Sequence, residues 1–177
     1  MVRCSGISPW NPSKENIRRS YAVIFRTPKT YFLVSGSSEG YTRLNAFDGA
    51  LLNAGVGNTN LVKVSSIIPP RSKEIQPVKL PGGAIVPTAY AHISSDISGE
   101  VISAAVAIAL PKDEEQPGLI MEYSAQGNKE EIELTARNMA SEGMKMRQQE
   151  ARQIKSISVE YTVRKIGAAF AAVILWR

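Results

Sequence analysis

The chain has 177 residues, of which 44% are hydrophobic and 21% charged, and its formal net charge is +5. These proportions are those of an ordinary globular domain with a core of its own. No apolar run reaches the roughly 18 residues that span a bilayer, and the first 20 residues lack the apolar centre of a signal peptide. One cysteine, Cys4, excludes an intrachain disulfide and a multi-cysteine metal site. We therefore expect a cytoplasmic protein without membrane contact.

The positive charge is concentrated at the amino-terminal end. Residues 1–30 contain six of the 21 basic residues and one of the 16 acidic residues, so the rest of the chain is balanced. A basic tail could bind nucleic acid, and a nucleic-acid-binding module is one alternative function. We expect instead that residues 1–29 form a solvated, flexible extension without a nucleic-acid partner. Residues 30–177 would then form a single domain.

The first half of that domain alternates strand, helix and strand patterns. Residues 31–36 are typical of a strand, and residues 37–42 of a turn. Thr42 is suited to cap a helix over residues 43–54, which Gly55 would end. The next predictions are a strand over 60–68, a loop over 71–83 and an extended segment over 84–96 that Pro87 places at an edge or a bulge.

The second half begins with an ambiguous run. Residues 101–110 combine alanines, which favour a helix, with Val and Ile, which favour a strand. Asn128 and Glu131 form a capping signature for a helix that continues to about Gln149. Further strands are predicted over residues 118–125, 156–163 and 168–176. Several strands around two or three helices predict an α/β or α+β sandwich.

Most catalytic constellations are absent from the sequence. The chain has one histidine, His92, so it has neither a histidine cluster for a metal nor a second imidazole base. His92 lies in an apolar stretch, where a structural role is expected. No Walker loop and no GxGxxG motif is present. An enzyme with this sequence would need chemistry that uses no histidine triad, metal or nucleotide.

A pair of serines ends an apolar run in the segment NTNLVKVSSIIPP, residues 58–70. The hydroxyl of Ser66 could attack the carbonyl of Ser65 and convert the amide to an ester. Planar amides are stable, so the step needs local strain and an oxyanion donor. The Asn60 side chain is one candidate donor. The pair alone is weak evidence, because Ser-Ser occurs at two other places in the chain.

Six blocks of sequence strengthen that interpretation, namely LVSGSSEG (33–40), LNAFDGALLNAGVGNTNLVKVSSIIPP (44–70), GAIVPTAYAHISSD (83–96), ALPKD (109–113), GLIMEY (118–123) and GAAFAAVILW (167–176). In this order and spacing they resemble the archaeal-type pyruvoyl-dependent arginine decarboxylases over residues 30–177. Two features depart from the family pattern. The tail before residue 30 is longer, and Arg43 stands where the family is expected to have a proline.

The resemblance implies that the chain cleaves itself between Ser65 and Ser66. The products would be a β chain of residues 1–65 and an α chain of residues 66–177 that begins with a pyruvoyl group made from Ser66. The ketone of that group would form a Schiff base with L-arginine and draw electrons as CO2 leaves, which is the role of PLP elsewhere. The product, agmatine, could feed polyamine synthesis or acid resistance.

The resemblance also assigns roles to individual residues. Glu122 would return a proton after decarboxylation, and its apolar neighbours independently predict a partly buried carboxyl, although an exposed acid is the alternative. Asn60 would act in processing and in the active site. Asp48 would pair with the substrate guanidinium. Leu44 and Leu51 would line the substrate pocket, or else pack in the core.

The family fold implied by the resemblance is a four-layer αββα sandwich. Its αβ units assemble as trimers or as dimers of trimers, with active sites between neighbours, so that Ser66 and Glu122 of one site could come from different units. The alternatives that stay open are a pyruvoyl decarboxylase for lysine, ornithine or histidine, and a member of the family that neither cleaves itself nor catalyses a reaction.

Overall fold

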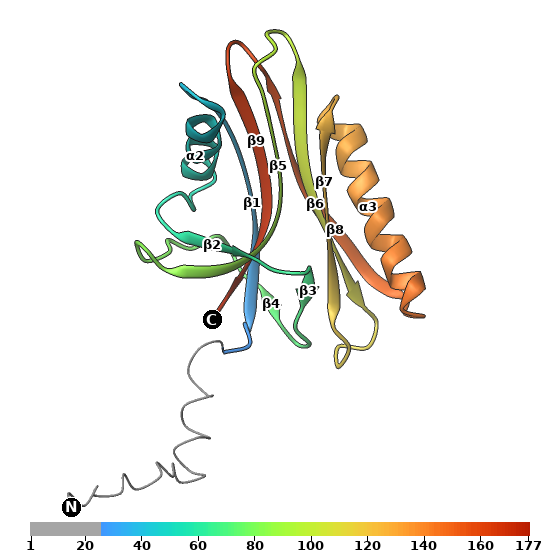
Figure 1. The fold of residues 1–177 in the computed structure, drawn as a ribbon. Helices are drawn as coiled ribbons and strands as arrows, with labels where there is room; N and C mark the ends of the chain where they lie inside the picture. The colour runs from blue at the N-terminus through green and yellow to red at the C-terminus, as the bar shows by residue number, and fades with distance from the viewer. Residues whose placement is uncertain (1–25) are drawn as a thin grey trace, which may run out of the picture.

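The computed structural model describes residues 26–177 (Figure 1). Residues 1–25, which include Cys4 and most of the expected basic extension, lie outside the described residues. Two helices and nine strands in the described part form an α+β fold with two separate sheets. Neither helix there is long and apolar enough to cross a membrane.

The larger sheet has five strands in the order β2-β5-β9-β1-β4. Its members are β1 (Thr30–Glu39), β2 (Asn60–Lys63), β4 (Lys73–Glu74), β5 (Ile85–Ser95) and β9 (Gly167–Trp176). The C-terminal strand β9 is central and runs antiparallel to both β1 and β5. The helix α2 (Arg43–Asn53) packs on this sheet, mainly against β1 and β9 (Figure 1).

The smaller sheet has four antiparallel strands in the order β3-β7-β6-β8. They are β3 (Ile67–Ile68), β6 (Val101–Pro111), β7 (Gly118–Gln126) and β8 (Ala151–Thr162). The long helix α3 (Lys129–Met146) packs on β6, β7 and β8. The two sheets face one another between the helices, as Figure 1 shows.

Strand alternation divides the core into three clusters. Along β9, Ala169, Ala171 and Val173 face the other sheet, whereas Phe170 and Ile174 pack toward α2. This two-residue period is that of a pleated strand, and because both faces are covered, β9 is apolar at nearly every position. Its small alanines let the sheets and the helix approach closely.

The same alternation decides the ambiguous run at residues 101–110, which is a strand. In β6, Ala104 and Val106 join the core between the sheets, whereas Ala105 and Ala107 pack under α3. The strand is hydrogen-bonded to β7 on one side and β8 on the other. Pairing on both sides outweighs the helical preference of alanine, because strand preference depends on such context.

Both predicted helix starts are confirmed. The Thr42 hydroxyl accepts a hydrogen bond from the Asn45 backbone N–H at 3.2 Å, and Asn128 Oδ1 accepts one from the Glu131 N–H at 3.0 Å. These bonds satisfy amide groups that the first helical turn leaves free. The helix α2 ends with Ala54 as its cap, and Gly55 follows in the left-handed region with a φ of 79°.

Several predicted boundaries were wrong. The turn over residues 37–42 begins later, because β1 continues to Glu39, which pairs with Gly167. The loop over 71–83 contains the short strand β4, which pairs with the start of β1. The helix α3 ends at Met146 rather than near Gln149, and β8 begins at residue 151, before the predicted start at 156.

The most informative correction concerns residues 60–68, predicted as one strand. The structure divides them into β2, at the edge of the five-stranded sheet, and β3, at the edge of the four-stranded sheet. Residues 64–66 join the two edges. A continuous apolar pattern did not reveal this break, because each half separately satisfies the strand pattern in its own sheet.

Candidate active site

The backbone is unusual where the chain passes from one sheet to the other. Ser66 has a φ of 60°, in the left-handed region that residues with a side chain seldom adopt. Such a conformation costs roughly 1–3 kcal/mol. Arg71 and Gln148 have similar φ values, so strain alone does not mark a reactive residue. Ser66 differs from them in its neighbours.

The pairing of β3 with β7 brings Glu122 to Ser66. Ile67 lies opposite Leu119, and the backbone N–H of Ile120 donates to the Ser66 carbonyl at 2.8 Å. Two residues further along β7, Glu122 points to the same side, and its Oε1 accepts a hydrogen bond from Ser66 Oγ at 3.4 Å. The two side chains therefore meet within one chain.

Glu122 is partly buried, as its sequence setting predicted. Its side chain is 22% exposed, and Oε2 is a buried atom that accepts no hydrogen bond from the residues the structure describes. A buried carboxylate oxygen without a donor is costly unless a nearby charge compensates it. The site thus leaves one carboxylate oxygen beside Ser66 and the other without a hydrogen-bond donor.

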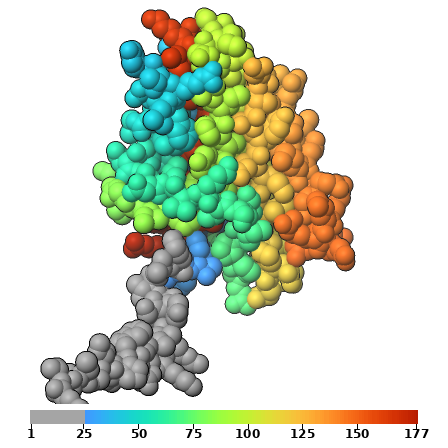
Figure 2. All heavy atoms as spheres, viewed as in Figure 1, coloured from blue at the N-terminus to red at the C-terminus, as the bar shows by residue number. Residues whose placement is uncertain are grey.

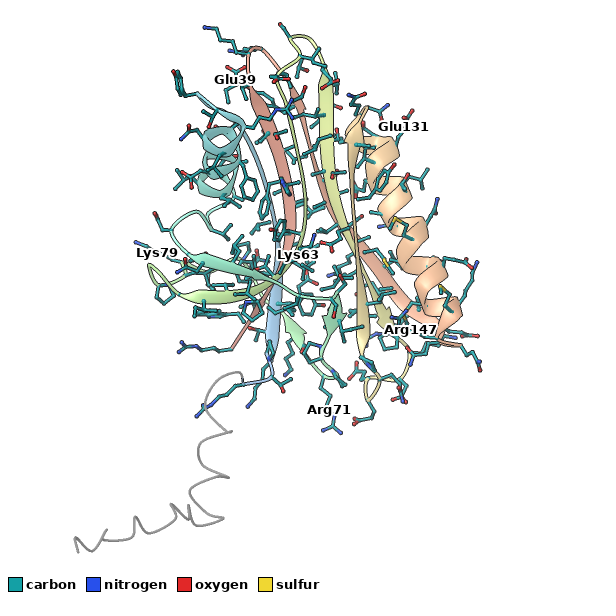
Figure 3. All side chains as sticks on the ribbon, in the orientation of Figure 1. Glu39, Lys63, Arg71, Lys79, Glu131 and Arg147 are labelled. Carbon is teal, nitrogen blue, oxygen red and sulfur yellow. The ribbon has the colours of Figure 1, made fainter. Side chains whose placement is uncertain are left out.

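The compensating charge is Lys63, which the sequence analysis missed. Its Nζ lies 3.5 Å from Glu122 Oε2, donates to the Tyr90 carbonyl at 3.0 Å and sits 4.7 Å from the centre of the Tyr90 ring. Figure 3 labels Lys63 where β2 crosses the other strands near the middle of the molecule. A basic residue three positions before Ser66 was the available indication.

His92 lies close to this group but belongs to an aromatic cluster. Its ring centre is 4.6 Å from that of Phe47 and 5.9 Å from that of Tyr90. Burial, followed by the positive charge of Lys63, lowers the pKa of His92 below its ordinary value. Its backbone carbonyl accepts a hydrogen bond from Ser124 Oγ, which ties β5 to β7 beside the site. These contacts agree with the structural role expected for His92.

Asn60 is not brought to the serine pair within the chain. It begins β2, and its Nδ2 donates to the Gly83 carbonyl at 2.9 Å. That bond joins β2 to the loop before β5. The Asn60 side chain is exposed, so it remains accessible from outside the chain.

The predicted substrate residues lie on α2. Asp48 is exposed, Leu44 is 73% exposed, and Leu51 is half-buried against the core beneath the helix. Leu44 and Asp48 are four positions apart and share the outer face of the helix. No hydrogen bond or ion pair within residues 26–177 joins Asp48 to Ser66 or Glu122.

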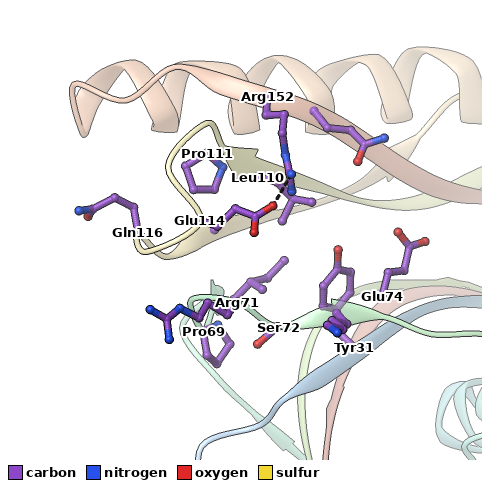
Figure 4. Close-up of a pocket in the computed structure, with 14 residues that line it drawn as sticks. Tyr31, Pro69, Arg71, Ser72, Glu74, Leu110, Pro111, Glu114, Gln116 and Arg152 are labelled. Carbon is purple, nitrogen blue, oxygen red and sulfur yellow. Dashed lines mark hydrogen bonds and ion pairs between the residues drawn. The ribbon is translucent and has the colours of Figure 1, made fainter.

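One cavity in the described part of the chain is lined by neither Ser66 nor Glu122. It has a volume of about 640 Å³, and its walls include Tyr31, Glu74, Glu114 and Arg152 (Figure 4). Burial, together with Glu74, raises the pKa of Tyr31 to about 12. A smaller cavity of about 350 Å³ is lined by Ser65 and its neighbours Val64 and Ile67, among others.

The surroundings of the serine pair are open to the surface. Ser65 is exposed and Ser66 half-buried. In the space-filling view of Figure 2, the teal and green atoms around residues 60–70 lie on the visible face beside the yellow atoms of residues 110–125. Among residues 26–177 no group of three or more metal-binding side chains gathers.

Comparison with known proteins decides the family. The sequence model of the pyruvoyl-dependent arginine decarboxylases matches residues 30–176. The chain belongs to this family. A protein of that name from Methanocaldococcus jannaschii is 57% identical over 152 residues, which cover 86% of this chain and 92% of the relative. A relative of the same name from Methanococcus maripaludis strain C5 is 50% identical, over 86% of this chain and 93% of the relative. Another, from Pyrococcus abyssi, is 46% identical, over 85% of this chain and 96% of the relative.

Proposed function

We propose that this chain is a carboxy-lyase that converts L-arginine to agmatine and CO2 with a pyruvoyl group made from its own Ser66. Membership of the pyruvoyl-dependent arginine decarboxylase family supports the reaction and the cofactor. The observation that carries the assignment of residues is the contact between Ser66 Oγ and Glu122 Oε1 at 3.4 Å, at the break between β2 and β3.

The residues around position 66 suit a pyruvoyl group. The backbone of Ser66 is held in a strained conformation, with a φ of 60° and its carbonyl bonded to the Ile120 N–H. Its side chain points at a carboxylate whose second oxygen is buried without a donor. A half-buried position beside an open surface leaves room for a substrate amine to reach it.

Formation of the group would begin with attack of Ser66 Oγ on the Ser65 carbonyl carbon. Glu122 Oε1, which accepts the Oγ hydrogen bond, can take the hydroxyl proton and pass it to the departing amide nitrogen. The amide thereby becomes an ester with a free amine. Loss of the α proton then expels the Ser65 carboxylate and leaves a dehydroalanine, which water converts to the pyruvoyl group with release of ammonia.

The pyruvoyl group, once formed, supplies an electron-withdrawing carbonyl that binds the substrate amine and makes loss of CO2 possible. Glu122 would then act as the acid that returns a proton to the α-carbon. A carboxyl next to position 66 and partly shielded from water is suited to this step.

The products of cleavage would remain one folded unit. The β chain, residues 1–65, contributes β1, α2 and β2, whereas the α chain, residues 66–177, contributes the remaining elements. All ten residues of β1 pair with β9, so the two chains share one sheet. We propose on this basis a single catalytic domain over residues 30–177 with the four-layer αββα order, and an extension over residues 1–29.

The substrate residues would be completed by assembly. Asp48 and Leu44 are exposed on α2, and Asn60 is exposed at the start of β2. A trimer of αβ units, or a dimer of such trimers, would bring these surfaces to the Ser66–Glu122 group of a neighbour. Asp48 would then pair with the guanidinium of arginine, since planar charged groups of this kind pair bidentately. Leu44 and Leu51 would contact the aliphatic part of the substrate.

The test is product analysis with purified protein. Arginine, lysine, ornithine and histidine are incubated separately, and the amines are measured by mass spectrometry. Agmatine from arginine, with much less amine from the other three, is expected. Preferential conversion of lysine or ornithine would support the alternative cationic substrate. A cleaved protein that releases no amine from any of them would contradict the proposed reaction.

A further inference from the structure

Lys63 is the only charged side chain, among the residues that the structure describes, that forms an ion pair with Glu122. Its side chain is 53% exposed, whereas that of Glu122 is 22% exposed and Oε2 of Glu122 is buried. Three separate contacts nevertheless hold its ammonium group, from the Tyr90 carbonyl, the Tyr90 ring and Glu122. A long side chain loses conformational entropy when it is held in this way, so the three contacts fix the ammonium group beside Oε2 against that cost.

The geometry relates Lys63 to the reacting serine through Glu122. Nζ faces Oε2 at 3.5 Å, whereas Oε1 faces Ser66 Oγ at 3.4 Å. One carboxylate oxygen is thus occupied by the cation and the other is left for Ser66. Without the cation, Oε2 would be a buried oxygen lacking both a donor and a countercharge, and the carboxylate would turn toward water.

Lys63 is itself fixed by the strand that precedes the serine pair. It ends β2 and pairs with Thr88 of β5, next but one to Tyr90. The same segment that delivers Ser66 to the four-stranded sheet therefore also delivers the cation. Three positions along the chain suffice to place both groups on opposite oxygens of one carboxylate.

We infer that Lys63 is a positioning residue that orients Glu122 toward position 66, both for self-cleavage and for the later proton return. This inference rests on the proposed function. Lys63 makes no contact with Ser66 among the bonds of the described residues, so it acts through Glu122. An arginine at this position could keep the positive charge and the length of the side chain, whereas methionine keeps a side chain of similar length without the charge.

A double-mutant cycle tests the inference. Self-cleavage is followed over time by denaturing gel and intact mass for wild type, K63M, K63R, E122Q and K63M/E122Q, and kcat and KM for arginine are measured on the cleaved fractions. We expect K63M to slow self-cleavage and to lower kcat about tenfold or more, with KM little changed. K63R should keep most of the wild-type rate of self-cleavage and most of kcat. K63M should have little further effect when E122Q is already present.

The matched control is K79M, because Lys79 is an exposed lysine in the loop before β5 (Figure 3). Rates for K79M should equal those of wild type. Additive effects of K63M and E122Q, or failure of K63R to restore the rates, would overturn the inference even if wild type makes agmatine. The variants could change the cleavage rate as expected while the cleaved wild type fails to turn over arginine. That result would uphold the orienting role of Lys63 in self-cleavage and count against the proposed reaction. A wild-type chain that never cleaves would overturn both.

Discussion

Ser66 and Glu122 are 56 positions apart in the sequence, yet Ser66 Oγ donates to Glu122 Oε1 at 3.4 Å. The contact exists because β3, only two residues long, pairs with the start of β7 directly after the chain leaves β2. One short strand pair therefore positions both the proposed cofactor precursor and the proposed proton-transfer group.

Replacing Ser66 should abolish self-cleavage. S66A removes the attacking hydroxyl and leaves the strained backbone and Glu122 in place. The purified variant should have the mass of one uncleaved chain and produce no agmatine. S65A is the matched control, since the step requires the Ser65 carbonyl and not its hydroxyl, and this variant should still cleave. Cleavage of S66A at the same bond would show that another nucleophile acts.

Replacing Glu122 with glutamine should spare the fold and impair catalysis. Gln is nearly the same shape, but it cannot carry a proton between Ser66 and the amide nitrogen or return one to the substrate. Because positioned acid–base groups contribute about 10²–10⁴-fold, we expect kcat for arginine to fall by about 100-fold or more. E142Q, at an exposed glutamate of α3 that pairs with Lys145, is the control and should match wild type. Wild-type turnover by E122Q would remove Glu122 from the mechanism.

Asp48 should determine affinity for the guanidinium. D48N keeps the size of the side chain and removes the charge, and a hydrogen bond to a charged group is worth about 1.5–3 kcal/mol. We therefore expect kcat/KM for arginine to fall roughly 10-fold to 150-fold, mostly through KM, with self-cleavage unchanged. D113N, in the exposed loop after β6, is the control. An unchanged KM for D48N would move the guanidinium site elsewhere.

The histidine titration reports the charge beside Glu122. Burial and then Lys63 lower the pKa of His92 from 6.5 in the folded chain. The unfolded chain therefore binds this proton more readily, so the resulting stability is present above pH 6.5 and is lost as the pH falls through 6.5 toward the folded value. K63M should raise the pKa of His92, which NMR can measure directly because the chain has one histidine. An unchanged pKa of His92 in K63M would show that the Lys63 charge does not act on His92.

The packing of α2 on β1 should tolerate no side chain at Gly36. A Cβ there would lie 2.7 Å from the Ala54 nitrogen and closer still to the Ala50 carbonyl oxygen, and backbone atoms cannot move aside cheaply. Overpacking of this kind costs about 1–3 kcal/mol, and each kcal/mol lowers the Tm of a domain this size by about 2–4 °C. G82A is the control, because nothing lies within 4 Å of its Cβ. Calorimetry showing equal Tm values for G36A and wild type would contradict this packing.

The helices and most strands could be predicted from the sequence because their determinants are local. Thr42 and Asn128 cap the helices as expected, and the alternating faces of β9 follow from its apolar run. The break at Ser66 could not be predicted, because it depends on which sheet each half of an apolar segment joins. Lys63 was missed for the same reason, since only the pairing of β2 with β5 shows where its side chain goes.

The site could be predicted only in part. Ser66, Glu122 and Asp48 came from family resemblance, and the partial burial of Glu122 also followed from its apolar neighbours. The meeting of Ser66 and Glu122 within one chain depends on the register of β3 against β7, a contact between distant segments that local patterns do not encode. Asn60 and Asp48 stay apart from that pair in the single chain, and only the proposed assembly would bring them to it.

The intact mass of the purified protein under denaturing conditions shows directly whether the chain cleaves itself between Ser65 and Ser66. We expect two chains. One ends at Ser65, and the other begins at position 66 with a pyruvoyl group in place of serine, so that its mass is lower by one ammonia than that of a chain beginning with serine. A single chain of full mass that stays unchanged on prolonged incubation would contradict this expectation. The chain would then keep the family fold without the cofactor on which the proposed reaction depends.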